Sequence, residues 1–115
     1  MRVILIDSGT ATEKRIDPSN IEEDVRSLIG CDVLASGGDI RNDHWVFVDD
    51  DGLFCSTNQF HQAEWAGQKL AGKMVVAGFS PTTMGLIEAT MSIEDVLSEV
   101  SYTGNTSAED AFYYL

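Results

Sequence analysis

The alternation of apolar and polar residues divides the start of the chain into a strand, a turn and a returning strand. The run from Val3 to Ile6 is apolar and rich in β-branched residues, which predicts a buried β-strand over Arg2 to Ile6. The next residues, Asp7 to Gly9, are typical of a turn. Glu13 to Ile16 is therefore expected to return as an edge strand.

An amphipathic helix is predicted between Ser19 and Gly30. Its apolar residues recur at helical spacing and form one stripe, which consists of Ile21, Val25, Leu28 and Ile29. Ser19 and Glu22 have the spacing of a capping box, in which each side chain bonds the other's free backbone amide. Gly30 is the expected left-handed end of the helix.

Strand and turn patterns alternate through the middle of the chain. Strands are predicted at Cys31 to Ala35 and at Trp45 to Val48, separated by a loop at Ser36 to Gly38. Asp49 to Gly52 is predicted to form a tight hairpin turn, because Asp and Gly tolerate positive φ. Leu53 to Ser56 would then be the returning strand.

A helix, a strand and a loop are predicted in the next part of the chain. Phe60 to Leu70 is expected to contain a short helix, which Gly67 weakens. Met74 to Ala77 has the composition of another core strand, and Pro81 to Gly85 that of an exposed loop. Four aromatic residues lie in or beside apolar runs and are expected in the core: Trp45, Phe60, Trp65 and Phe79.

The last third of the chain is predicted to be helical. Ser92 can cap a helix with Asp95 at the third position, and the expected buried face consists of Ile93, Val96, Leu97 and Val100. A loop at 103–105 would lead into a second short helix that begins at Ser107. The expected fold is therefore α+β: a small, mostly antiparallel sheet with a helix of the N-terminal half packed on it, and C-terminal helices. One domain would span residues 1–101, with 102–115 as a C-terminal extension.

Composition and length limit the class of protein. The chain has 115 residues, of which 43% are hydrophobic and 23% charged, so it has the composition of one globular domain rather than of a low-complexity or disordered chain. No apolar run approaches the roughly 18 residues that a membrane span needs. The apolar run at the start is shorter than a secretory signal, so we expect a cytoplasmic protein.

The charge of the chain excludes some partners and favours others. Nineteen acidic residues stand against seven basic ones, and the net charge is −12. Direct binding to nucleic acid or to an anionic membrane requires Lys and Arg, so neither is expected. Such a charge steers a protein toward basic partners. Simple solubility, or the acidic proteome of a salt-loving host, would explain the same charge.

The chain contains few residues that could perform chemistry. Cys31 and Cys55 have no metal-binding spacing and are expected to be buried thiols, and no catalytic signature surrounds His44 or His61. The acids of 49–51 are consecutive, whereas a calcium loop needs ligands at alternating positions, so a turn is favoured over a metal site. Glycine-rich phosphate-binding motifs are missing. We therefore expect no cofactor, no metal and no enzymatic activity.

Five segments of the chain, mainly turns and strands, match one family pattern. They are the opening MRVILID, the passage from Leu28 to Val33, the acidic turn from Asp49 to Leu53, Asn58, and the glycine-bracketed strand from Gly72 to Gly78. In these segments the chain resembles a phage- and plasmid-borne family, catalogued as domain of unknown function 3846. The family supplies no catalytic residues. The resemblance implies an accessory protein of a mobile element, with proteins of the host cell as targets.

The leading hypothesis is a non-enzymatic phage-type protein that binds and inhibits a host protein with a basic surface. The target would be a defence or nucleic-acid-processing factor, and the carboxylates would imitate phosphates. Tyr113 and Tyr114 are included because consecutive aromatic residues on a helix cannot all face inward. The expected partner-binding residues are Glu22, Glu23, Asp24, Asp49, Asp50, Asp51, Tyr113 and Tyr114.

Two other hypotheses remain from the sequence. The first is a sponge that sequesters a signalling nucleotide or metabolite in a pocket between subunits of a homo-oligomer. The scarcity of Lys and Arg makes an anionic nucleotide a poor ligand for such a pocket. The second is an enzyme, which would require an acid, a base and a nucleophile that this sequence does not place at any recognisable spacing.

Overall fold

The computed structural model describes residues 1–30, 33–41, 43–49, 58–63 and 68–106. The larger of two sheets is six-stranded, with the order β2-β1-β7-β4-β3 and with β8 paired to β7. Its strands are β1 (Arg2–Asp7), β2 (Thr10–Arg15), β3 (Leu34–Ile40), β4 (His44–Asp49), β7 (Met74–Ser80) and β8 (Gly85–Ile87). The smaller sheet is three-stranded, with the order β6-β5-β9. It consists of β5 (Asn58–Ala63), β6 (Gln68–Ala71) and β9 (Val100–Thr106).

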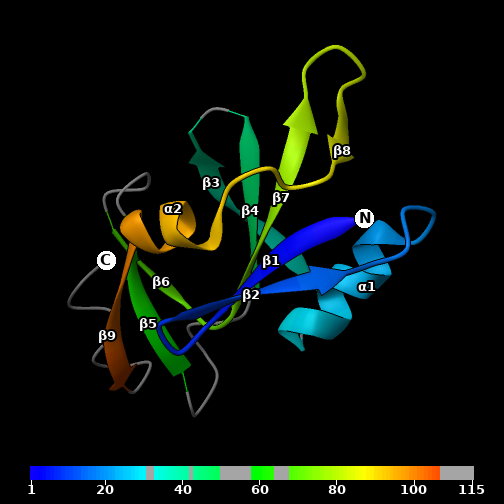
Figure 1. Ribbon diagram of the computed structural model, residues 1–115. Helices are drawn as coiled ribbons and strands as arrows, with labels where there is room; N and C mark the ends of the chain where they lie inside the picture. The colour runs from blue at the N-terminus through cyan, green and yellow to red at the C-terminus, as the bar shows by residue number, and fades with distance from the viewer. Residues whose placement is uncertain (31–32, 42, 50–57, 64–67, 107–115) are drawn as a thin grey trace.

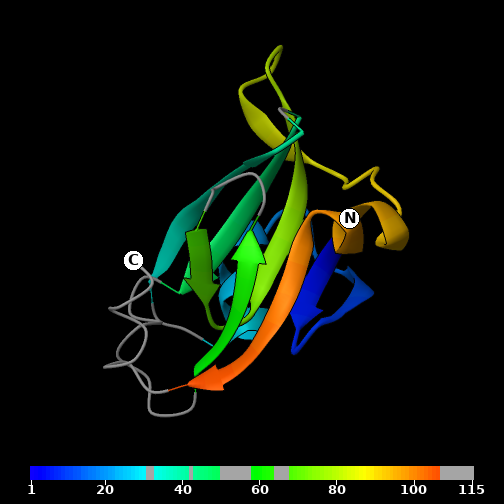
Figure 2. The ribbon, with the colours of Figure 1, turned by 90° about the vertical axis from the view of Figure 1, so that its left-hand side faces the viewer.

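The described part of the chain folds in layers. Helix α1 (Ile21–Ile29) lies against one face of the large sheet, and helix α2 (Ile93–Ser98) lies near the other face, where it leads into β9. Figure 1 shows α1 at one side of the large sheet and the small sheet at the opposite side, and Figure 2 shows β5, β6 and β9 running beside the large sheet. All of the strand pairs are antiparallel, so the expectation of an α+β fold with a mostly antiparallel sheet is confirmed.

Strand alternation gives the large sheet two buried faces, because successive residues of a strand point to opposite sides. On the α1 face, Val75 and Ala77 of β7 pack with Val25 and Ile29 of α1. The α2 face is the larger core, and it consists of Ile4, Ile6, Ile40, Val46, Val48, Met74, Val76, Ala89, Met91, Val96 and Val100. The central strands are therefore apolar on both sides, unlike the edge strand β2.

The N-terminal predictions agree with the structure except at the helix cap. The β1–β2 turn is at Ser8 and Gly9, which both have positive φ, as a two-residue hairpin requires. Helix α1 ends at Gly30 with a φ of 78°. The predicted capping box is wrong: the N-cap is Asn20, without a side-chain cap bond. Ser19 instead donates its backbone N–H and its hydroxyl to Asp17 Oδ1, at 2.9 and 2.7 Å.

Two predictions in the middle of the chain are wrong. Ser36 to Gly38 lies inside β3, where the register shifts between Ser36 and Gly38, so the glycines mark a β-bulge rather than a loop. The expected helix over Phe60 to Leu70 is replaced by parts of β5 and β6. Strand β5 pairs with β9 from the end of the chain, and a local pattern cannot show such a pairing. The expected strand at Leu53 to Ser56 lies outside the described residues.

The C-terminal predictions agree in part. Ser92 Oγ accepts a hydrogen bond from the Asp95 amide at 3.1 Å, as a helix cap should. Helix α2 ends at Ser98, however, and Leu97 is 37% exposed rather than buried. Residues 103–105, expected as a loop, lie in β9, which also crosses the expected domain boundary between 101 and 102. The expected helix from Ser107 lies outside the described residues.

Candidate functional site

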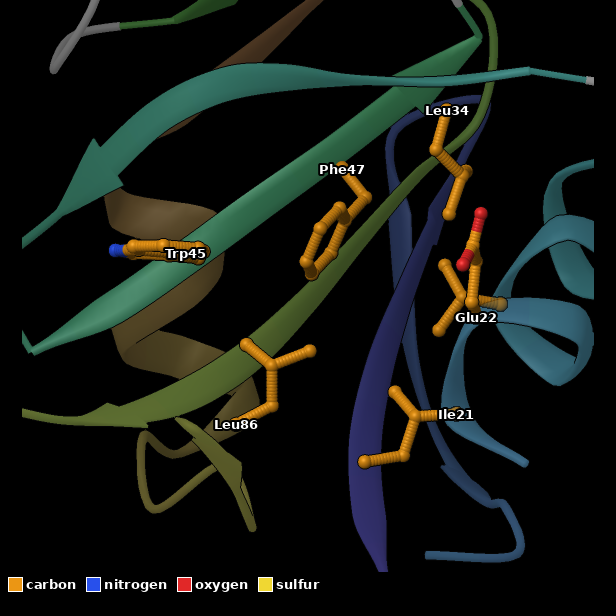
Figure 3. Close-up of a pocket in the computed structure, with 7 residues that line it drawn as sticks. Ile21, Glu22, Leu34, Trp45, Phe47 and Leu86 are labelled. Carbon is orange, nitrogen blue, oxygen red and sulfur yellow. The ribbon is translucent and has the colours of Figure 1, made fainter. Parts of the chain in front are cut away.

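A groove lies on the α1 face of the large sheet, between α1 and strands β3, β4 and β8. It has a volume of about 340 Å³. Figure 3 shows its two sides: Ile21 and Glu22 extend from α1, and they face Trp45 and Phe47 of β4 and Leu86 of β8. The residues that line it are Ile21, Glu22, Val25, Leu34, Trp45, Phe47 and Leu86. Apart from Glu22 the lining is apolar, so the groove suits an apolar group with one polar attachment point.

The alternation of β4 explains why two large aromatic side chains lie in this groove. His44, Val46 and Val48 are buried, whereas Trp45 and Phe47 between them are half-buried. The Trp45 ring stacks on Phe79 of β7, with centroids 4.3 Å apart and planes within 10° of parallel. The backbone that carries Trp45 and Phe47 is hydrogen-bonded on both sides, because β4 is paired with β3 and with β7. The expectation that Trp45 and Phe79 belong to the core is therefore only partly met, because both are half-buried.

Glu22 and Glu23 lie in the first turn of α1 and are exposed. A carboxylate is favourable there, because the N-terminus of a helix carries partial positive charge. Figure 3 shows the Glu22 carboxylate reaching from the helix toward Leu34, along the side of the groove. Neither carboxylate forms an ion pair with any side chain in the described part of the chain.

The other expected binding residues are not gathered in the same way. Asp24 accepts hydrogen bonds from the Asp17 backbone N–H at 2.9 Å and the Asn20 side-chain amide at 3.4 Å, so it holds the start of α1. Asp49 is the last residue of β4 and pairs with Leu34. Asp50, Asp51, Tyr113 and Tyr114 lie outside the described residues.

Several acids elsewhere on the described surface are compensated by basic side chains, whereas the exposed Glu94 of α2 has no ion pair among the described side chains. Arg2 and Arg15 both contact Glu13, and Arg15 also contacts Glu88. Arg41 contacts Asp95 and Glu99 at 3.4 and 3.3 Å. Exposed pairs of this kind contribute little to stability, but they reduce the local negative charge. The first turn of α1 therefore differs from these regions.

His44 is the buried polar residue of the described core, at 2% exposure. Its Nε2 accepts the backbone N–H of Thr90 at 3.0 Å, and the Thr90 hydroxyl is 3.3 Å from the same nitrogen. Since Nε2 is the acceptor, Nδ1 is the ring nitrogen that donates to Asp43 Oδ1, at 2.8 Å. This hydrogen bond lowers the pKa of the Asp43 carboxyl. Since a backbone amide engages Nε2, the residue connects β4 to the segment after β8.

A second carboxylate with a lowered pKa lies beside α1. Asp17 accepts both hydrogen bonds from Ser19, first the backbone N–H and then the hydroxyl, and these bonds favour its charged form.

Within the described ranges, no group of three His, Cys, Asp or Glu side chains is placed to hold a metal ion. Neither helix in the described part of the chain is long and apolar enough to cross a membrane.

The fold and the groove define a two-sheet α+β protein with an apolar groove and an acidic helix start at its side. Comparisons of the chain with protein-family models, with curated proteins and with solved structures found no match. The resemblance drawn from the strand and turn motifs therefore stays an expectation.

Sequence reasoning missed the groove, although one signal for it exists. The alternation in β4 places Trp45 and Phe47 on the same face, opposite the buried face of His44, Val46 and Val48. An aromatic pair on the alternate positions of a strand indicates a face that needs a covering element. Leu86 could not have been found in this way, because its strand is not predicted: the expected loop ends at Gly85, the first residue of β8.

Proposed function

We propose that this chain is a non-enzymatic binding protein that occupies a basic surface of a partner protein and thereby inhibits it. The contact is made by the acidic first turn of α1, with the acids of 49–51 and the tyrosines at 113 and 114 as further contacts. From the family resemblance, the partner is a host-cell protein in the cytoplasm, such as a defence or nucleic-acid-processing factor. The carboxylates then take the place of nucleic-acid phosphates.

The observation that supports this proposal is the contrast between Glu22 and Glu23 and the acids that arginines pair. These two are exposed and have no ion pair with described side chains, whereas Glu13, Glu88 and Asp95 are paired with arginines. A basic partner therefore gains more at α1 than at the compensated regions. With a net charge of −12, long-range attraction also speeds its approach.

The proposal is tested by affinity capture from a bacterial host lysate with Glu22→Lys, Glu23→Lys and Glu94→Lys. Glu94 is an exposed acid in the first turn of α2, so its replacement changes the net charge and the helix start in the same way and serves as the matched control. We expect capture to be lost in the two α1 variants and kept in the control. At about 1 M salt the screening length is about 3 Å, and capture should be lost for every form.

Two outcomes would contradict the proposal. One is equal capture by all three variants, which would show that α1 is not the contact. The other is capture that survives high salt without loss, which would indicate an apolar rather than an electrostatic interface. Inhibition is then measured on the captured partner, by its binding to nucleic acid with and without the chain.

A small-ligand sponge is the second candidate, and the groove favours it. Its volume of about 340 Å³ lies at the lower end of the range of about 300–1,000 Å³ that ligand pockets have. None of the described residues that line it is Lys, Arg or His, so a neutral or cationic metabolite is more complementary than a nucleotide. Native mass spectrometry of the purified protein would show a co-purifying small molecule if this candidate is correct.

A further inference from the structure

Among the described residues, helix α1 covers only part of one face of the large sheet. The helix is nine residues long, and its buried residues Val25 and Ile29 pack over Val3, Val75 and Ala77. Toward β3, β4 and β8 the cover by α1 ends, and the side chains that form the groove there are half-buried. An apolar surface that is left half-covered beside polar residues is typical of an interaction site.

The apolar surface continues beyond the groove along β8. A second hollow of about 370 Å³ is lined by Met1, Pro18, Leu86, Ile87 and Glu88. Leu86 lines both hollows, and Ile87 beside it is 45% exposed. A segment of extended chain laid over Leu86 would therefore contact both hollows.

The charge at the groove specifies what such a segment carries. Glu22 is the titratable residue of the lining, and Glu23 follows it in the same helical turn. Aromatic rings together with a carboxylate favour a guanidinium or an ammonium group, which attracts the ring faces and pairs with the carboxylate. Among the described side chains, none forms an ion pair with Glu22.

We propose that this groove receives a peptide segment of the partner protein that presents an aliphatic or aromatic side chain next to an Arg or a Lys. The apolar side chain lies between Phe47 and Leu86, and the cation pairs with the Glu22 carboxylate. The volume admits one or two side chains rather than a packed helix, so the partner is recognised through an anchor residue. This inference rests on the proposed function and specifies how the basic partner is recognised.

The test is selection from an immobilised library of random nine-residue peptides, with the purified full chain as the probe. For wild-type protein, we expect selected peptides in which Arg or Lys stands next to a large apolar residue. Glu22→Lys should bind those peptides at least about tenfold more weakly, whereas the matched control Glu94→Lys should bind them as wild type does. Equal losses in both variants, or selected peptides without basic residues, would overturn the inference.

The apolar part is tested with Leu86→Asp against Leu97→Asp. Leu97 is a partly exposed leucine on α2, so it controls for the loss of one surface leucine. We expect binding of the selected peptides to be lost only in Leu86→Asp. Because this variant could fail to fold, NMR chemical-shift mapping on wild-type protein provides a second measurement. Shifts confined to the groove residues support the inference, and shifts that cluster on any other face overturn it.

The two proposals can fail separately. If phenethylamine shifts the groove signals while no peptide is selected, the groove is a small-ligand pocket and the docking inference is wrong. If lysate capture depends on Glu23 but is unchanged by Leu86→Asp, the proposed function stands and the groove inference is wrong. If capture is unchanged by both α1 charge reversals, the proposed function itself is wrong, whatever the peptide library shows.

Discussion

The Trp45 ring lies flat against Phe79, with centroids 4.3 Å apart and planes within 10° of parallel. The two residues belong to neighbouring strands, since Trp45 is opposite Ala77 in the β4–β7 register. Phe79 is in turn opposite Leu86 of β8. One row of side chains therefore runs from the groove wall on β4 to the strand that lies between the two hollows.

The stack should be measurable as a coupling between two substitutions. We expect Trp45→Leu and Phe79→Leu to be non-additive in urea unfolding, with a coupling free energy of about 0.5–1.5 kcal/mol. Trp45→Leu combined with Leu97→Ala is the control, because α2 lies on the other side of the sheet, and these effects should add. If the changes in the free energy of unfolding for Trp45→Leu and Phe79→Leu simply add, the two rings stabilise the fold through their buried area and not through the stacking contact.

His44 should stabilise the fold through the Thr90 amide. His44→Leu leaves that backbone N–H without its acceptor and removes the partner of Asp43. We expect a loss of about 1–3 kcal/mol in the free energy of unfolding. Thr90→Val removes the more distant hydroxyl contact and keeps the amide, so it should change stability by less than about 0.5 kcal/mol. If both variants lost a similar free energy of unfolding, the stabilising contact of His44 would be the one with the Thr90 hydroxyl rather than with the Thr90 amide.

Gly78 holds the β7–β8 hairpin close to the chain that follows it. A Cβ at this position would lie 2.3 Å from the Glu88 carbonyl oxygen, which is backbone and cannot move aside alone. We expect Gly78→Ala to lower the free energy of unfolding by about 1–3 kcal/mol. Gly85→Ala is the matched control in the same hairpin, because its Cβ would have no neighbour closer than 3.7 Å. Thermal unfolding of the two variants, followed by circular dichroism, compares them directly.

Stability should fall in acid partly through Asp43. The hydrogen bond from His44 holds the pKa of this carboxyl below its ordinary value of 3.8. A lowered pKa in the folded state means that the group stabilises the fold above about pH 3.8, and that this contribution is lost as the pH falls through the folded-state pKa. The carboxylate is largely exposed, so the effect is modest. In Asp43→Asn, the urea midpoint should vary less with pH below about 4 than in wild type.

Asp17 provides the comparison for this pH dependence. Its pKa is lowered mainly by the Ser19 amide and then by the Ser19 hydroxyl, and Ser19→Ala removes only the hydroxyl. Both carboxylates are expected to act in the same pH range and in the same direction. If the urea midpoint of Asp43→Asn varies with pH below about 4 in the same way as that of wild type, the prediction for Asp43 is wrong. The contact with His44 would then not lower the pKa of Asp43 in the folded state relative to the unfolded state.

Local elements of this protein follow from its sequence because they depend on neighbouring residues. The β-branched run at β1, the apolar stripe of α1, its end at Gly30 and the cap at Ser92 each involve contacts within a few residues. The N-cap of α1 was predicted one residue too early, because the Asp17 carboxylate competes for the Ser19 donors. Such competition between nearby acceptors is not visible in a spacing rule.

The candidate site could be predicted only in its charge. The acids of α1 and their place in its first turn follow from the helix pattern, and Glu22 and Glu23 are exposed there as expected. Asp24, in contrast, accepts hydrogen bonds from Asp17 and Asn20. Other acids are paired with arginines through contacts across the fold, and these arginines are Arg2, Arg15 and Arg41. Which carboxylates are available to a partner was therefore decided by tertiary structure.

The sequence by itself determined an acidic α+β chain and the segments that form its central strands and helices. Tertiary structure alone decided that Gly37 and Gly38 belong to a bulged strand, that residues of 58–71 pair with one another and with 100–106, and that Trp45, Phe47 and Leu86 line one groove. The physical reason is that an amphipathic pattern specifies which side of an element is apolar. It does not specify which distant strand covers that side, or where the cover ends.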